Sequence, residues 1–234
     1  MSNIEEEYQN FFSSKNVAIV GPSSVMDNSG CGDLIDSFDI VVRMNRALPI
    51  KNTEDFGSRT DILYNNLDAE DKRRGAIDPE MWKSCGVKYV SSLASREVWY
   101  SDPSISEPYR DQFPIRWIPD KIYDSLHRQI NGRTNAGTML IYDILQTKMS
   151  KMFILGLDFH RFLYTKDYYK NSEYDNAVNC RETASKMLTS SSSGHDPDSQ
   201  YMWFKNSVFR KDPRVFVQKY FREILENDQY DKMF

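Results

Sequence analysis

Cysteine is scarce in this sequence, and its scarcity limits the kinds of protein that the chain can be. The 234 residues include three cysteines, Cys31, Cys85 and Cys180, which are widely separated and form no CxxC pair. Such a set is typical neither of a disulfide framework nor of a zinc site, and it indicates a reducing compartment.

An excess of positive charge and a long apolar stretch are also missing. Thirty basic and thirty-four acidic side chains give a formal charge of −4 at pH 7, so no overall basic field attracts a nucleic-acid backbone. The N-terminal sequence MSNIEEEYQNFF is acidic where a signal peptide needs basic residues, and no apolar run reaches membrane-spanning length. We therefore expect a cytoplasmic protein with no nucleic-acid partner and no membrane span. The sequence does not indicate its oligomeric state.

Short apolar runs recur at intervals typical of βαβ units. The first run, Val17–Val20, is rich in β-branched residues and ends in a Gly-Pro-Ser-Ser turn, which predicts a buried strand. Further strands are expected at 40–45, 61–65, 87–92, 115–118, 152–156 and 214–217, and helices at 138–149 and 201–208. This order predicts one α/β domain over 1–234, Rossmann-like, with a mostly parallel sheet flanked by helices.

One long segment, 162–194, shows no apolar period. It ends in the low-complexity run TSSSSG at 189–194. Segments of this kind are usually functional or disordered, and we expect a flexible lid that precedes His195.

Two candidate binding features follow the first two expected strands. Backbone and hydroxyl groups of Gly21-Pro22-Ser23-Ser24 could hold a nucleotide, although such a turn is most often only a turn. Asn45 at the end of the second strand could offer both a donor and an acceptor to a base or ribose, or it could be a solvated strand end. The carboxyl ends of parallel strands meet in one crevice, so both features would face it.

A third feature opens the helix expected at 138–149. In Arg133-Thr134-Asn135-Ala136-Gly137 the small polar residues leave the first helical N–H groups available for a phosphate or carboxylate. A plain N-cap explains the same residues equally well. No Gly-Lys-Ser or Gly-Lys-Thr follows, so this is not a P-loop.

The fourth feature is His195, the one histidine of three that a loop presents. A side chain with a pKa near neutrality can take a proton from an attacking hydroxyl, although a lone loop histidine is more often incidental. The acidic runs 68–71 and 196–198 are better explained as solvated or capping acids than as metal ligands. A GxSxG elbow is absent from the sequence, which argues against a Ser-His-Asp triad.

Taken together, these motifs resemble the sialyltransferases. IVGPSS, IDSFDIVVRMNRA and EDFGSRT are similar to the large sialylmotif of the eukaryotic-type enzymes. Residues 133–137 through 156–159 resemble the small sialylmotif, and are closer in style to the matching helix and strand end of bacterial sialyltransferases. Asp167-Tyr168-Tyr169-Lys170 resembles the third motif, and His195 with Gln200 resembles the last.

The resemblance implies a variant nucleotide-sugar Rossmann fold of the GT-A kind and a metal-independent enzyme with no cofactor. It implies inverting transfer of sialic acid, or of the related acid sugar Kdo, from a CMP-sugar donor to a hydroxyl of a glycan acceptor, with His195 as the general base. The donor-binding residues that it implies are Gly21, Pro22, Ser23, Asn45, Asn65, Asn135, Ala136, Gly137, Gly156, Asp158, Phe159, Tyr164 and Tyr168.

The chain departs from the family pattern at several positions. Val17 stands in place of the cysteine of the family's disulfide, and Pro22 replaces a donor-binding Asn. Asp167 replaces the His of the third motif, and Gln200 replaces the Glu of the last. Two alternatives therefore stay open: a catalytically silent nucleotide-sugar-binding module, and a transferase that uses another nucleotide sugar.

Overall fold

The computed structural model describes residues 3–67, 77–92, 109, 111–130, 132–165, 168 and 195–228. Cys180, the acidic run at 68–71, the third-motif residues apart from Tyr168, and most of the expected lid lie outside these residues.

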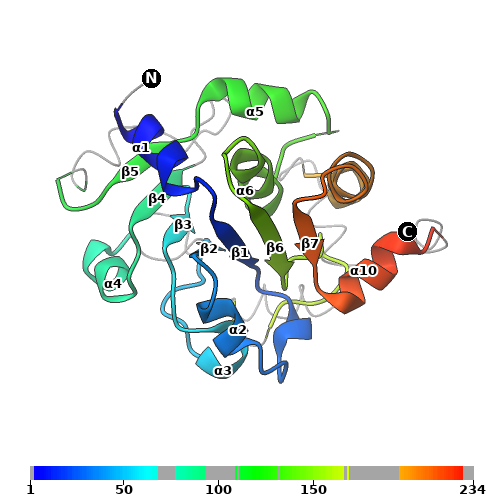
Figure 1. Cartoon of the computed structure of the whole chain (residues 1–234), viewed down its shortest axis with the longest axis horizontal. Coiled ribbons are helices and arrows are strands. Elements are labelled where there is room, and N and C mark those ends of the chain that lie inside the picture. Colours follow the sequence, from blue (N-terminus) through cyan, green and yellow to red (C-terminus); the bar gives the residue numbers. More distant parts are fainter. Residues whose placement is uncertain are drawn as a thin grey trace.

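Seven strands form one sheet in which every pairing is parallel (Figure 1). The strands are β1 (Asn16–Val20), β2 (Ile40–Met44), β3 (Ile62–Tyr64), β4 (Tyr89–Ser92), β5 (Ile115–Trp117), β6 (Lys151–Leu155) and β7 (Val215–Val217). Their spatial order is β5-β4-β3-β2-β1-β6-β7, so the chain winds outward from β1 to β5 and then resumes on the other side of β1. The predicted α/β fold with a mostly parallel sheet is confirmed. The connections therefore run in opposite directions on the two sides of β1, toward β2 on one side and from β6 to β7 on the other. Where the direction changes, the loops at the carboxyl ends of the strands separate and leave a crevice.

Helices cover both faces of this sheet. They are α1 (Asn3–Phe11), α2 (Gly32–Asp36), α3 (Thr53–Phe56), α4 (Pro79–Ser84), α5 (Asp120–His127), α6 (Ala136–Leu145), α9 (Pro197–Trp203) and α10 (Lys219–Glu226), with a 3-10 turn at Ser24–Met26 and a π-helix at Phe204–Phe209. In Figure 1, α1, α5 and α6 lie on one side of the strands, and α2 and α3 lie on the other. None of the helices in the described part of the chain is both long and apolar enough to cross a bilayer.

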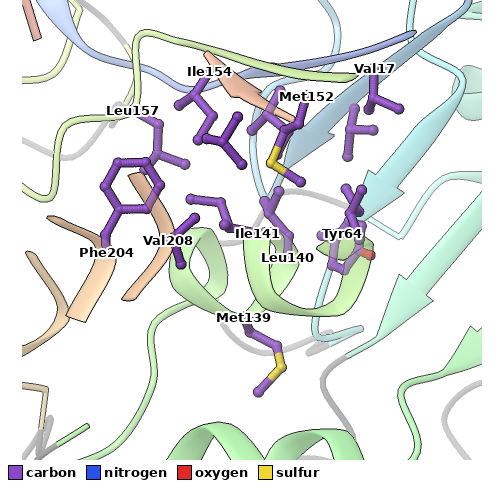
Figure 2. Close-up of a cluster of buried hydrophobic side chains, with 14 of the residues drawn as sticks. Val17, Tyr64, Met139, Leu140, Ile141, Met152, Ile154, Leu157, Phe204 and Val208 are labelled. Carbon is purple, nitrogen blue, oxygen red and sulfur yellow. The ribbon is translucent and has the colours of Figure 1, made fainter. Parts of the chain in front are cut away.

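Alternation along β1 divides its side chains between two cores. Val17 and Ile19 join the large cluster under α1, α5 and α6, whereas Ala18 and Val20 join a smaller cluster with Met26 and other residues near α2 and α3. Figure 2 shows Leu140 and Ile141 of α6 in the large cluster, close to Met152 of β6. Because β1 and β2 are buried on both faces, they appear in the sequence as nearly continuous apolar runs.

A buried ion pair holds α6 against the sheet. The Arg116 guanidinium donates to both carboxylate oxygens of Asp143 at 2.7 and 3.0 Å, and its Nε donates to Glu5 at 2.7 Å. The Tyr64 hydroxyl also donates to Asp143. This network connects α6 to β5, β3 and α1, and so fixes the helix whose N-terminus reaches the crevice.

The boundaries of two predicted helices differ from the sequence expectation. The helix expected at 138–149 runs from Ala136 to Leu145, because the Asn135 side chain accepts from the Thr138 N–H and starts the helix earlier. The helix expected at 201–208 begins at Pro197, because Asp196 caps it by accepting from the Ser199 N–H at 2.9 Å. In both cases the capping side chain precedes the apolar pattern that defined the prediction.

Candidate active site

A cavity of about 90 Å³ opens at the carboxyl edge of the sheet between β1, β2, β6 and the N-terminus of α6. We call it the β1–α6 cavity. Its walls include the predicted residues Pro22, Ser23, Asn45, Asn135, Ala136, Gly137, Gly156, Asp158, Phe159, Tyr164 and Tyr168, together with Met44, Leu157 and His160. Residues that span well over half of the sequence therefore meet at one place, which is the crevice that the doubly wound topology creates.

Two predicted donor-binding residues lie elsewhere. Gly21 is absent from these walls and lines a neighbouring cavity. Its role is close packing, because a Cβ at this position would lie 2.3 Å from the Gly156 carbonyl oxygen. Asn65 is buried after β3, and its Oδ1 accepts from the Leu67 N–H at 2.8 Å, which forms a local turn.

Two buried acceptor atoms at the cavity have no hydrogen-bond donor within the described part of the chain. They are Oδ1 of Asn45 and Oδ2 of Asp158. Asn45 has a φ of 51° and therefore leaves β2 in the left-handed region, which Asn tolerates better than most residues. A buried acceptor without a donor is costly in a native protein, and N–H or O–H groups of a ligand or of a water molecule would satisfy both atoms.

Asp158 is the titratable acid of the cavity. Burial raises its pKa to about 6, while the nearby Ser23 hydroxyl and the N–H groups of Phe162 and Arg161 act in the opposite direction. The Arg161 N–H donates to Oδ1 at 3.1 Å. The carboxyl group is thus largely ionised at neutral pH and becomes neutral in mild acid.

The N-terminus of α6 contributes positive backbone dipole to the cavity. Ala136 and Gly137 are its first residues, and the first N–H groups of any α-helix lack a partner within the helix. The adjoining cap is rigid because Gln200, which is fully buried, accepts from the Asn135 N–H at 3.2 Å and from the Thr138 hydroxyl at 2.5 Å. These features suit a phosphate or carboxylate.

His195 is tied to the same helix start. Its Nδ1 lies 2.9 Å from the Arg133 carbonyl oxygen, and this oxygen also accepts from Gln200 Nε2 at 3.1 Å. Since a carbonyl only accepts, the Nδ1 atom carries the proton and Nε2 is the unprotonated nitrogen of the neutral ring. His195 does not line the β1–α6 cavity directly, but a positive charge on its ring, in the protonated form, lowers the pKa of His160, which does.

His160 is a site residue that the sequence analysis missed. It stands in the cavity wall with Nδ1 3.2 Å from the Tyr164 hydroxyl. Its enclosed position lowers its pKa to about 4, and the charges of His195 and Arg161 add to this effect. Phe159 and His160 both have positive φ, 55° and 63°, which is uncommon for such residues and typical of functional sites. Its position directly after the GLDF strand end was the available signal.

A backbone interaction places the two predicted tyrosines. The Thr165 N–H donates to the Pro22 carbonyl at 2.7 Å, and Ser23 forms an isolated antiparallel bridge with Tyr164. The segment after β6 therefore folds back over the β1 turn. The rings of Tyr164 and Tyr168 lie 5.3 Å apart in the cavity wall.

In the described ranges, no group of three or more His, Cys, Asp or Glu side chains is arranged to hold a metal ion. Metal independence and the absence of a cofactor stay predictions.

Comparison with known proteins finds sequence similarity in the N-terminal part of the chain. Residues 4–100 match the family model "Glycosyltransferase family 29 (sialyltransferase)". The resemblance to sialyltransferases that the motifs indicated is thereby confirmed for the N-terminal part of the chain.

Individual proteins are similar to this chain in sequence over a short segment or in fold. A 60-residue segment is 40% identical to an alpha-N-acetylneuraminide alpha-2,8-sialyltransferase of Xenopus tropicalis, covering 25% of this chain and 17% of the relative. A mammalian sialyltransferase structure superposes with a TM-score of 0.54 at 14% identity, covering 93% of this chain and 79% of that one. The sialyltransferase Cst-II of Campylobacter jejuni, solved as a variant with CMP, superposes with a TM-score of 0.55 at 12% identity. The match covers 87% of this chain and 80% of that one. The structural matches show a common fold.

Proposed function

We propose that this protein is a glycosyltransferase that moves sialic acid from CMP-sialic acid to a hydroxyl of a glycan acceptor. The observation that carries the proposal is the β1–α6 cavity, where the sialylmotif residues meet around two buried acceptors, Asn45 Oδ1 and Asp158 Oδ2, to which no described residue donates. Ribose hydroxyls and the cytosine amino group are donors that would satisfy them. The similar Cst-II structure contains CMP, which supports the same nucleotide here.

In this proposal His195 is the general base. With the proton on Nδ1 held by the Arg133 carbonyl, Nε2 accepts the proton of the acceptor hydroxyl as that oxygen attacks the anomeric carbon. The bond to the phosphate breaks on the opposite face, so the anomeric configuration is inverted. The acceptor oxygen gains the sugar, and CMP leaves with the bonding electron pair.

Negative charge develops on the phosphate as it departs. The N–H groups at the start of α6 would stabilise it, together with the Tyr164 hydroxyl and the neutral ring of His160. This donor set would perform the charge stabilisation that a divalent metal supplies in other transferases. We infer a metal-independent reaction on this basis, and we propose from the parallel sheet with flanking helices that the fold is a variant of GT-A.

Donor turnover tests the proposal. Purified protein is incubated with CMP-sialic acid, CMP-Kdo, a uridine-diphosphate sugar and a guanosine-diphosphate sugar, with a galactoside panel as acceptors, and nucleotide release is measured with and without EDTA. The proposal requires release from CMP-sialic acid that EDTA leaves unchanged. Binding of CMP without turnover of any donor would favour the catalytically silent binding module. Turnover of CMP-Kdo alone, or of a diphosphate sugar alone, would show that the protein uses that donor instead of CMP-sialic acid.

A further inference from the structure

A second cavity, of about 120 Å³, lies beside the β1–α6 cavity on the side of α3. We call it the Arg43 cavity. The two cavities share Pro22, Met44 and Tyr168 as a common wall. The function proposed above assigns nothing to this second space.

Arg43 is the unusual residue of this cavity. Its side chain is buried, with 2% of its surface exposed, and its guanidinium donates to neutral oxygens. Nε donates to the Arg59 carbonyl at 3.2 Å and to the Thr60 hydroxyl at 3.0 Å. Nη2 donates to the Phe56 carbonyl. No carboxylate within the described ranges forms an ion pair with it. Burial lowers its pKa to about 10 and the charge of Asp36 opposes this shift, so the side chain stays charged at neutral pH.

Two further cations line the same cavity. Arg46 and Lys51 belong to the loop after β2, and none of the described residues that line the cavity is an Asp or Glu. Neither side chain has a hydrogen bond or ion pair to another described residue. Three cations around one small space repel each other, and this occurs in a chain whose formal charge is −4. Bonds to the 56–60 loop account for Arg43 as a structural residue, but they do not account for Arg46 and Lys51.

We propose that the Arg43 cavity binds an oxyanion, a carboxylate or a phosphate ester, attached to an apolar group. The three cations provide the charge, and a guanidinium suits two-oxygen anions. The apolar part of the ligand would contact apolar side chains of the same wall, namely Val20, Met44, Pro49, Ile50 and Phe56. Because the cavities share a wall, this anion lies next to whatever occupies the β1–α6 cavity.

The anion has two possible sources, which binding experiments separate. It is either a charged group of the ligand that fills the β1–α6 cavity or part of a second molecule. Phenyl phosphate is a suitable probe because it places a phosphate on an apolar ring, and its affinity is measured by isothermal titration with and without saturating CMP. Displacement by CMP assigns the anion to the first source, and simultaneous binding assigns it to a second molecule. The test does not depend on transferase activity.

Variants decide whether the cations form the site. The double variant Arg46→Gln/Lys51→Gln, called the rim variant, removes both loop charges and should weaken the binding of phenyl phosphate by about ten-fold or more. The matched control Arg128→Gln/Lys211→Gln removes two exposed charges elsewhere. It should change the affinity for phenyl phosphate by less than about two-fold. Phenol, which lacks the anion, should bind at least about ten-fold more weakly than phenyl phosphate. Equal affinity of the rim variant and the wild type would overturn the proposal.

Arg43 itself is tested by titration of the wild-type protein, and a variant serves only to identify its resonance. In protein labelled with 15N-arginine, the Nε–H resonance of Arg43 is identified by its loss in Arg43→Lys. It should shift during titration with phenyl phosphate and saturate with the same affinity as the calorimetric signal. A resonance that stays unchanged at saturation would overturn the assignment of this cavity.

Discussion

The Nδ1 atom of His195 lies 2.9 Å from the carbonyl oxygen of Arg133, and this contact joins two segments that are more than sixty residues apart. It fixes the tautomer of the ring and anchors the candidate base to a residue two positions before the α6 cap, Asn135. We therefore predict that His195→Ala lowers the transfer rate by about 10² to 10⁴-fold, as expected for loss of a general base. The affinity for CMP should change by less than about three-fold, because the base acts on the acceptor.

His127 provides the matched control for this variant. It ends α5, stacks on Tyr123 with ring centroids 5.8 Å apart, and is absent from both cavities. His127→Ala should retain wild-type transfer. A His195→Ala enzyme with the wild-type rate would exclude His195 as the base and direct attention to His160.

Gln200 is predicted to be required as an amide. It accepts from Asn135 N–H and from Thr138 Oγ1 through its oxygen, while its nitrogen donates to the Arg133 carbonyl. In Gln200→Glu an ionised carboxylate keeps the two acceptor contacts but faces that carbonyl without a proton to donate. We expect a loss of about 1 to 3 kcal/mol in the free energy of unfolding at neutral pH.

The same variant has a predicted pH dependence. Burial raises the pKa of the new carboxyl in the folded state, so the folded protein binds the proton more strongly and its stability falls as pH rises. Urea unfolding at several pH values measures this effect. The deficit of Gln200→Glu relative to the wild type should shrink in acid, and a deficit that is constant across pH would contradict this account of the contact.

Replacing each of two glycines of the site by alanine should lower the free energy of unfolding by very different amounts. At Gly21 a Cβ would lie 2.3 Å from the Gly156 carbonyl oxygen, which is backbone and cannot move alone. At Gly137 the nearest atom is Leu157 Cδ1 at 2.9 Å, the end of a flexible side chain. Gly21→Ala should cost about 3 kcal/mol or more, and Gly137→Ala less than about 1 kcal/mol. Urea midpoints compare them, and similar midpoints would show that β1 and β6 do not approach as closely as described.

Asp158 gives a second pH prediction. Its pKa rises from 3.8 in the unfolded chain to about 6 in the folded protein, so the folded state binds the proton more strongly. Stability contributed by this group is full below pH 3.8 and is lost as pH rises to about 6, amounting to about 2 to 3 kcal/mol. Asp158→Asn should therefore gain stability relative to the wild type at pH 8 and lose that gain at pH 4. A pH-independent difference in unfolding free energy between the two proteins would contradict the shifted pKa.

Much of the scaffold could be predicted from sequence because its signals are local. Val17–Val20 forms a strand because a run of β-branched residues stops at a turn, and the start of α6 follows from a capping Asn that precedes an apolar period. The sialylmotif residues then indicated which strand ends would meet, and most of them do meet in the β1–α6 cavity.

Other features depend on contacts between distant segments, and local patterns do not report them. His160 enters the cavity only because the chain after β6 takes two successive positive φ values and folds back over the Pro22 turn. Gln200 is buried because the segment after His195 closes against α6. The three cations of the Arg43 cavity come from a strand end and a following loop, and only the three-dimensional structure shows that none of them forms an ion pair with a carboxylate of the described residues.

Equilibrium binding of CMP tests the central claim, which is that the β1–α6 cavity holds the nucleotide. Isothermal titration at pH 7.5 compares the wild type with Asp158→Asn and with the control Arg128→Gln/Lys211→Gln. We predict that the wild type and the control bind CMP equally, that UMP binds more weakly than CMP, and that Asp158→Asn weakens CMP by about ten-fold or more. No detectable binding of CMP to the wild type, or equal affinity in Asp158→Asn, would contradict the claim.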